Sequence, residues 1–153
     1  LAKRLAESWN SVIWARRVVA CTGLLAAGGM LVIATRLGDP VWAMVALAMA
    51  SFSNDLAMAC GWGACMDVGG RHAGALSGSM NMMGNLGGAV GPFVVGLILE
   101  AGKSAADAKP SLGSWITCFL VAAGIYVIGA VAWLFIDPVT PLDQEGARGC
   151  PAP

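Results

Sequence analysis

Charged residues are scarce in this sequence. Only 12% of the 153 residues are Asp, Glu, Lys or Arg, while 58% are hydrophobic, and the mean hydropathy is +0.73. Because a soluble domain carries about a quarter charged residues, this composition excludes an ordinary water-soluble domain. The net charge is zero and Lys and Arg form no extended basic face, which excludes the electrostatic footprint of a nucleic-acid-binding protein.

Metal ligands and catalytic groups are also few. His72 is the single histidine and lies in a polar turn, and the five cysteines are scattered without a paired metal spacing. On a helix Cys60 and Cys65 would point about 140° apart, so they are read as small buried hydrophobes. The segment Gly96–Ser104 is one residue longer than a phosphate-binding P-loop and follows an apolar helix instead of a strand. We therefore expect no metal, no cofactor and no enzymatic activity.

Four long apolar runs make up most of the sequence. Each has about the length that a helix needs to cross a hydrocarbon core of roughly 30 Å. The sequence therefore predicts an all-α membrane protein with four transmembrane helices. A cytoplasmic loop over 1–17 precedes them, and a disordered cytoplasmic tail over 137–153, rich in proline and glycine, follows them. The four runs cover residues 18–35, 41–66, 73–99 and 114–136.

The distribution of Lys and Arg predicts the orientation of these helices. One side collects Lys3, Arg4, Arg16, Arg17, Arg71 and Arg148, and the other side has Arg36, Lys103 and Lys109. By the positive-inside bias, the first side and both termini are expected to be cytoplasmic, in a multi-pass protein of a bacterial inner membrane. Trp14, Trp42, Trp115 and Trp133 fall near the predicted interfaces, either as an aromatic belt or as residues that fill helix contacts.

Asp55 lies near the middle of the second run. An ionised carboxylate at that depth costs about 2.5–3.5 kcal/mol, so it should not face lipid. At helical spacing Ser51, Asp55, Met58 and Trp62 form one stripe that joins a carboxylate to an amphipathic ring. Two interpretations stay open: the stripe lines a water-filled substrate cavity, or Asp55 holds a neighbouring helix by a hydrogen bond.

Asn81 and Asn85 lie one helical turn apart in the third run. Both amides are costly to leave unpaired in hydrocarbon, so they must face protein or water. An amide can donate to the carboxylate and hydroxyl groups of an acidic sugar, and it can equally bond another helix. We assign Asn81 to substrate contact and Asn85 to helix packing.

The third run is also rich in glycine. Glycines at four-residue intervals allow a second helix to approach closely, which is a packing signal. A proline after the last of them removes a backbone hydrogen bond, so the helix can bend there, either as a gate or as a static kink. These packing and gating candidates are Gly74, Gly78, Gly84, Gly87, Gly88, Gly91 and Pro92.

The stretch Gly61–Gly88, GWGACMDVGGRHAGALSGSMNMMGNLGG, resembles the tenth and eleventh spans of the anion:cation symporter family, within the major facilitator superfamily. The ending Trp133–Pro138, WLFIDP, is similar to the exit of that family's twelfth span, and the basic segment 3–17 resembles its loop between spans eight and nine. The resemblance implies that the chain is a fragment with the last four helices of a twelve-helix carrier. Two halves of such a carrier rock about a central site.

The resemblance further implies a function. Similar carriers move sugar acids, namely hexuronates, aldonates and aldarates, together with protons, and the residues that match Trp62 and Asn81 face the substrate. The proton-coupling residues would lie in the missing N-terminal helices, so this chain alone is not expected to transport. The alternative is a non-transporting four-helix membrane module, either an assembly subunit or a membrane-embedded enzyme. A start codon close to Leu1 would favour that module, and eight further hydrophobic spans upstream would favour the carrier.

Overall fold

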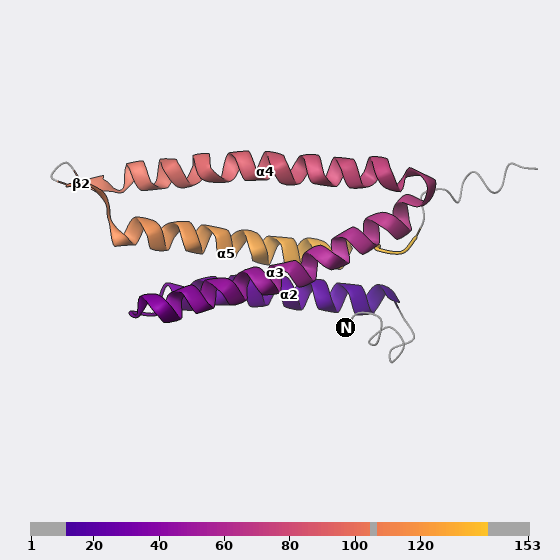
Figure 1. Cartoon of the computed structure of the whole chain (residues 1–153), viewed down its shortest axis with the longest axis horizontal. Helices are drawn as coiled ribbons and strands as arrows, with labels where there is room; N and C mark the ends of the chain where they lie inside the picture. The colour runs from indigo at the N-terminus through magenta and orange to yellow at the C-terminus, as the bar shows by residue number, and fades with distance from the viewer. Residues whose placement is uncertain (1–11, 105–106, 141–153) are drawn as a thin grey trace, which may run out of the picture.

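The computed structural model describes residues 12–104 and 107–140. This part of the chain forms four α-helices, one short 3-10 helix and a two-stranded hairpin (Figure 1). The elements are, in chain order, α2 (Val12–Ala34), α3 (Pro40–Gly69), η1 (Gly70–His72), α4 (Ala73–Ala101), β1 (Lys103–Ser104), β2 (Asp107–Pro110) and α5 (Leu112–Phe135).

The first helix begins earlier than the apolar run that predicted it. Residues 12–17, expected in a cytoplasmic loop, form the first turns of α2. Alanine and arginine favour helix, and the helical backbone directs Arg16 and Arg17 towards the ends of two other helices. The remainder of the expected loop, residues 1–11, lies outside the described residues.

Local signals start and end the next two helices. Asp39 caps α3 by accepting a hydrogen bond from the N–H group of Val41 at 2.8 Å, and Pro40 occupies the first helical turn. Gly70, with a φ angle of 46°, ends α3 in a conformation that favours glycine. After η1 the chain turns back into α4, which stays helical through Pro92.

Small side chains build the core between α2, α3 and α5. The buried face of α3 repeats at alternating intervals of four and three residues: Ala46, Ala50, Ser53, Ala57, Cys60 and Ala64. α2 carries Gly23 on its side towards α3 and Gly28 on its side towards α5. A Cβ atom at Gly23 would lie 2.7 Å from the carbonyl oxygen of Ser53, and one at Gly28 would lie 3.3 Å from that of Ala123 on α5. The three helices therefore pack nearly backbone to backbone.

α4 stands apart from this core. It has no buried residue, and every residue from 81 to 94 is exposed. In Figure 1 it runs along one edge of the molecule and α2 lies along the other, while α3 crosses from the edge of α2 to the start of α4. Gly69 and Ala73 pack together where α4 begins, and Gly102 lies against Ser114 of α5 where it ends.

Three stretches of the described chain are long and apolar enough to cross a membrane. They are Val12–Ala34, Pro40–Ala101 and Leu112–Phe135. The second stretch contains both α3 and α4, which fold back on each other at η1 (Figure 1). The protein is therefore an integral, multi-pass, predominantly α-helical membrane protein, as the sequence predicts.

The first residues of the expected tail, 137–140, make contacts with the bundle and with one another. Pro138 is fully buried, and the Asp137 carboxylate accepts a hydrogen bond from the Thr140 hydroxyl at 2.6 Å and from the N–H group of Val139 at 3.1 Å. Arg16 donates to the backbone carbonyl of Pro138, and Arg17 donates to that of Ile136 just before the tail, which holds this segment against the bundle. Residues 141–153 lie outside the described residues.

Candidate functional site

The predicted polar stripe lies on the uncovered face of α3. At about 100° per residue, Ser51, Asp55, Met58 and Trp62 all fall within about 40° of the point opposite buried Ser53. All four residues are exposed, whereas Ser53 is only 8% exposed. The stripe therefore faces away from α2.

The groups of this stripe differ in their bonding. The Ser51 hydroxyl donates to the carbonyl of Leu47 at 3.2 Å, one turn back in the same helix. Among the described residues, Asp55 has no hydrogen-bond or ion-pair partner. The Trp62 side chain is 41% exposed. A carboxylate and an indole are thus available to a ligand or to a further helix, but the described helices do not use them.

The two asparagines of α4 are also exposed. The Asn85 amide donates to the backbone carbonyl of Asn81 at 3.0 Å, which satisfies one of its donors inside the helix. Asn81 directly follows Met80, whose side chain contacts α3 at Gly61 and Cys65. Trp62 directly follows Gly61, so the structure brings the segments that carry Trp62 and Asn81 to the same level of the bundle. Asp55 lies two turns of α3 away from Trp62, about 10 Å along the helix axis.

The glycines that were expected to pack another helix have open space around them. A Cβ atom at Gly74, Gly78, Gly84, Gly87, Gly88 or Gly91 would meet nothing within 4 Å among the described residues. Their packing role stays a prediction, and so does gating at Pro92. Glycines at which other helices do approach closely include Gly23 and Gly28, and the small-residue repeat of α3 could have been recognised from its spacing.

Two arginines of α2 tie together the ends of three helices, a feature that the sequence did not reveal. Arg16 forms an ion pair with Asp67 near the end of α3 and donates to the carbonyl of Pro138 at 2.8 Å. Arg17 donates to the carbonyl of Ile136 at 2.8 Å and 3.1 Å, and its guanidinium lies 5.7 Å from the centre of the Trp14 ring. Cations suit the C-terminal ends of α3 and α5, where backbone carbonyls lack partners.

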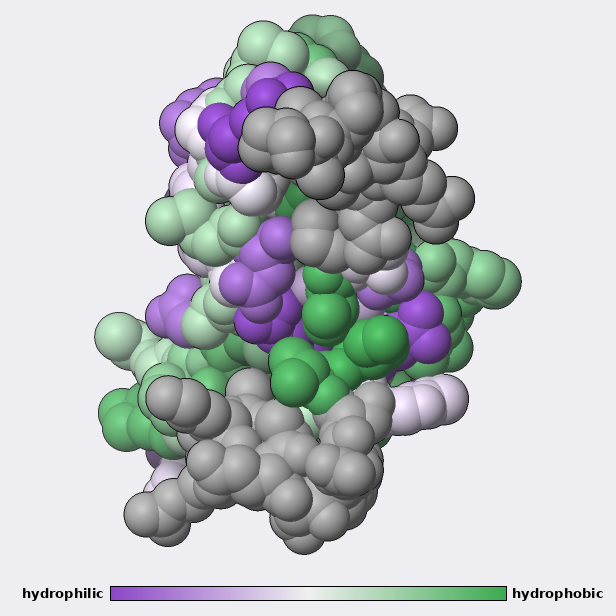
Figure 2. All heavy atoms as spheres, turned by 90° about the vertical axis from the view of Figure 1, so that its right-hand side faces the viewer, coloured by the Kyte–Doolittle hydropathy of each residue, from purple (hydrophilic) through white to green (hydrophobic). Residues whose placement is uncertain are grey.

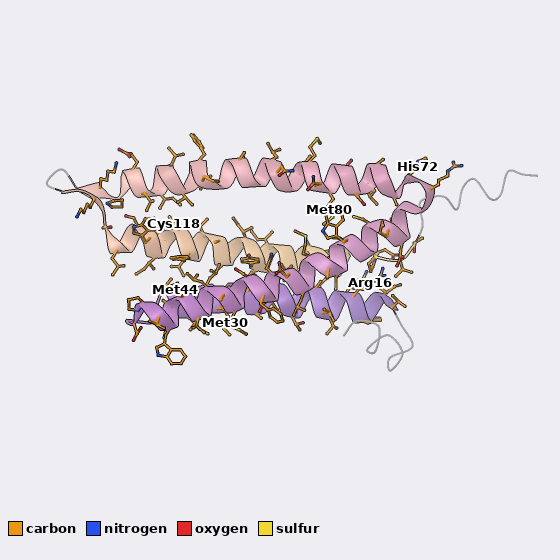
Figure 3. The ribbon with its side chains drawn as sticks, in the orientation of Figure 1. Arg16, Met30, Met44, His72, Met80 and Cys118 are labelled. Atoms are coloured by element: carbon orange, nitrogen blue, oxygen red, sulfur yellow. The ribbon has the colours of Figure 1, made fainter. Side chains whose placement is uncertain are left out.

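This end of the molecule is polar. Figure 2 looks onto it and shows hydrophilic side chains gathered between hydrophobic ones, and Figure 3 places Arg16 and His72 at the same end. The hydrogen bond from Thr140 and those from the N–H groups of Val139 and Thr140 hold the pKa of Asp137 below its usual value. A charged, hydrogen-bonded end is typical of a helix bundle at a membrane–water interface.

The described residues contain no group of three or more His, Cys, Asp or Glu side chains that could hold a metal ion. The candidate groups on α3 and α4 are instead a carboxylate, an indole and two amides. Indole and amide groups recognise ligands by stacking and hydrogen bonding.

Comparison with known proteins identifies similar transporters. The chain is 30% identical to the probable sulfoacetate transporter SauU of Cupriavidus necator, over 97% of this chain and 32% of that protein. It is 28% identical to the probable chloroplastic anion transporter 4 of rice, over 87% of this chain and 21% of the relative. It is 29% identical to sialin of sheep, over 85% of this chain and 25% of the relative. No family model and no solved structure matches the chain.

The chain therefore spans about a third or less of the length of these relatives. The similarity nevertheless extends over nearly the whole of this chain, including all four α-helices. From its apolar helices and these relatives, the chain is a multi-pass membrane protein that is similar to one part of known anion transporters.

Proposed function

We propose that this chain is the C-terminal part of a secondary transporter of the major facilitator superfamily, which carries a small organic anion, a sugar acid, together with protons. In this proposal α2, α3, α4 and α5 each span the membrane once and form the last four of twelve helices. The observation that carries the proposal is the similarity to anion transporters over nearly the whole chain. The chain alone would not transport, since it supplies only part of one rocking half.

The uncovered polar groups support a substrate site on α3 and α4. Charged and amide groups in membrane helices are costly unless they face protein or an aqueous cavity. Asp55, Trp62 and Asn81 are exposed on α3 and α4, and Trp62 and Asn81 flank the same helix contact. In the proposed site Trp62 stacks on the sugar acid, Asn81 donates a hydrogen bond to it, and Ser51 and Asp55 line the cavity.

The open face of α4 supports the presence of further helices. Exposed glycines at four-residue spacing are suited to close helix contacts in a membrane, and these relatives are about three to four times as long as this chain. We propose that the N-terminal helices of the same carrier cover this face, with Asn85 and the glycines in the contact.

The positions of the basic residues support a cytoplasmic location for both termini. Arg16, Arg17 and Arg71 lie at the end where α2 begins and α3 ends, while Arg36, Lys103 and Lys109 lie at the opposite end. The first end also carries the interhelix bonds of Arg16 and Arg17. By the positive-inside bias it faces the cytoplasm, in the inner membrane of a bacterium.

The test is uptake by the full-length carrier in proteoliposomes with an imposed pH gradient. The panel contains glucuronate, gluconate and galactarate, with sulfoacetate, ascorbate and phosphate as anions from the names of the relatives. We expect proton-driven uptake of a sugar acid. Trp62→Ala and Asn81→Ala should each weaken its apparent affinity by about tenfold, equivalent to 1.4 kcal/mol.

Trp62→Phe and Asn54→Ala are the controls. The first keeps an aromatic face for stacking, and the second removes an amide of α3 that lies outside the polar stripe. Unchanged affinity in both alanine variants at Trp62 and Asn81 would rule out the site. Uptake of no anion in the panel would rule out the transport function and favour a non-transporting membrane module.

A further inference from the structure

Three helices converge at Gly61 of α3. A Cβ atom there would lie 3.1 Å from the terminal methyl group of Met80 on α4 and 3.9 Å from the Trp133 ring on α5. Gly61 itself is partly buried. On the same side of α3, the Cys65 thiol lies 3.3 Å from the sulfur atom of Met80. We call Gly61, Cys65, Met80 and Trp133 the Gly61 joint.

Met80 is the point at which α4 separates from α3. At the turn the two helices touch, because a Cβ atom at Gly69 would lie 3.2 Å from that of Ala73 and 3.6 Å from that of Leu76. Beyond Met80, every residue from 81 to 94 is exposed. Figure 3 shows Met80 between α4 and the C-terminal part of α3.

The joint lies next to the two residues that the proposed function assigns to the substrate. Trp62 follows Gly61, and Asn81 follows Met80. The backbone of a helix is stiff over one residue, so the separation of Gly61 and Met80 sets the separation of the segments that carry Trp62 and Asn81. The absence of a side chain at Gly61 allows the Met80 methyl group to lie close to α3, and the Trp133 ring lies beside the same position.

We propose that the Gly61 joint fixes the spacing between Trp62 and Asn81 and thereby selects the size of the anion that the carrier binds. This inference rests on the proposed substrate role of Trp62 and Asn81. Gly61 and Met80 act as positioning residues, because they act through their neighbours. A methyl group at Gly61 requires the terminal methyl group of Met80 to move by a few tenths of an ångström, which widens the site. A shorter side chain at position 80 lets α4 approach α3.

The experiment compares two dicarboxylates of equal charge, tartrate and the longer galactarate, as inhibitors of uptake of the best transported anion. It uses the full-length carrier, and the readout is the ratio of the two inhibition constants. We expect Gly61→Ala to shift the ratio at least threefold in favour of galactarate. Met80→Ala should shift it in favour of tartrate, and the double variant should lie nearer to wild type than Gly61→Ala does.

The maximal uptake rate separates positioning from general damage. A residue that merely supports the fold would lower the rate for all variants and leave the ratio of inhibition constants unchanged. Gly29→Ala is the matched control, because a Cβ atom at Gly29 would meet nothing within 4 Å in the part of the chain that the structure describes. Met80→Ala adds no atoms to the joint, so it keeps the test open should Gly61→Ala fail to fold.

The outcomes are distinct. A wild-type carrier that takes up no anion of the panel refutes the proposed function and this inference with it. An active wild type whose inhibition ratio is the same in Gly61→Ala and Met80→Ala refutes the inference alone. A ratio that shifts equally in Gly29→Ala also refutes it.

Discussion

The carbonyl oxygen of Ser53 lies 2.7 Å from the position that a Cβ atom would occupy at Gly23. The two residues belong to α2 and α3 and lie on their facing surfaces, where Ala20, Ala27 and Ala57 are also buried. Between membrane helices, association depends on close van der Waals packing, because lipid is as apolar as the side chains. This contact is therefore expected to contribute much of the stability of the helix pair.

Gly23→Ala should destabilise the chain by about 1–3 kcal/mol, because the added methyl group meets backbone that cannot rotate away. A Cβ atom at Gly29 has open space among residues 12–104 and 107–140, so Gly29→Ala should be neutral or stabilising by up to about 1 kcal/mol, since alanine favours helix. The free energy of unfolding by sodium dodecyl sulfate in mixed micelles gives both values. Equal stability of the two variants would show that α2 and α3 do not pack as described.

Ser53→Leu and Ser51→Leu make the same change on opposite faces of α3. Ser53 is buried, and its hydroxyl donates to the carbonyl of Met49 at 2.8 Å, so leucine there overfills the contact with α2 and costs about 1–3 kcal/mol. Ser51 is exposed, and its replacement should change stability by less than about 0.5 kcal/mol. The same unfolding experiment measures both. A larger loss at Ser51 would reverse the assignment of the two faces.

Arg16→Ala should destabilise the chain more than Asp67→Asn. The ion pair is partly exposed, with 17% of the Arg16 side chain and 49% of the Asp67 side chain accessible, so it is expected to contribute about 1 kcal/mol or less. Arg16→Ala additionally removes the hydrogen bond to the Pro138 carbonyl, for a total of about 1–3 kcal/mol.

Unfolding of both single variants and of the double variant separates these two contributions. Arg36→Ala is the control, since Arg36 is exposed at the opposite end of the bundle. An Asp67→Asn variant that loses as much stability as Arg16→Ala would mean that the ion pair alone holds these helix ends.

Thr140→Val should raise the pKa of Asp137 towards its ordinary value of 3.8, because the hydroxyl of Thr140 is the main group that lowers it. When a carboxyl group has a lower pKa in the folded state than in the unfolded state, it stabilises the fold at pH values above its unfolded pKa. This stabilisation is lost as the pH falls through the folded-state pKa. The variant should therefore be less stable than the wild type at neutral pH. Its stability should also fall less than that of the wild type when the pH is lowered from neutral to below 3.8.

Titration of the Asp137 carboxyl carbon by NMR measures the shift directly. Thr117→Val is the matched control, because the Thr117 hydroxyl donates only to Gly113 of its own helix, at 2.9 Å. An unchanged Asp137 pKa in Thr140→Val, or an equal rise in Thr117→Val, would contradict the assignment.

The helices themselves could be predicted from local signals. Asp39 with Pro40, and Gly69 with Gly70, mark one helix start and one turn, and these residues act at those positions in the structure. The face of α3 that carries small residues could also be predicted from the sequence, since these residues recur at alternating intervals of four and three positions. The prediction instead singled out the glycines of α4, because a spacing rule identifies a surface that can pack without identifying its partner.

The candidate site was only partly open to prediction. That Asp55 and Trp62 share a face of one helix follows from their spacing, and both are exposed in the structure. The contact of Met80 with Gly61 and Cys65 joins residues fifteen or more positions apart, and no periodicity within either helix indicates it. The same holds for the bond of Arg16 to Pro138, which are 122 residues apart.

The sequence alone determined that the chain enters a membrane as helices, because long uncharged runs avoid water and only a helix satisfies its own backbone groups in lipid. Those are local properties of each segment. The tertiary structure decided which helix faces meet. Gly23 packs against Ser53, Arg16 joins the ends of three helices, and Met80 packs against Gly61. The physical reason is that van der Waals contact and hydrogen bonds between helices depend on the complementary shape of surfaces far apart in the chain.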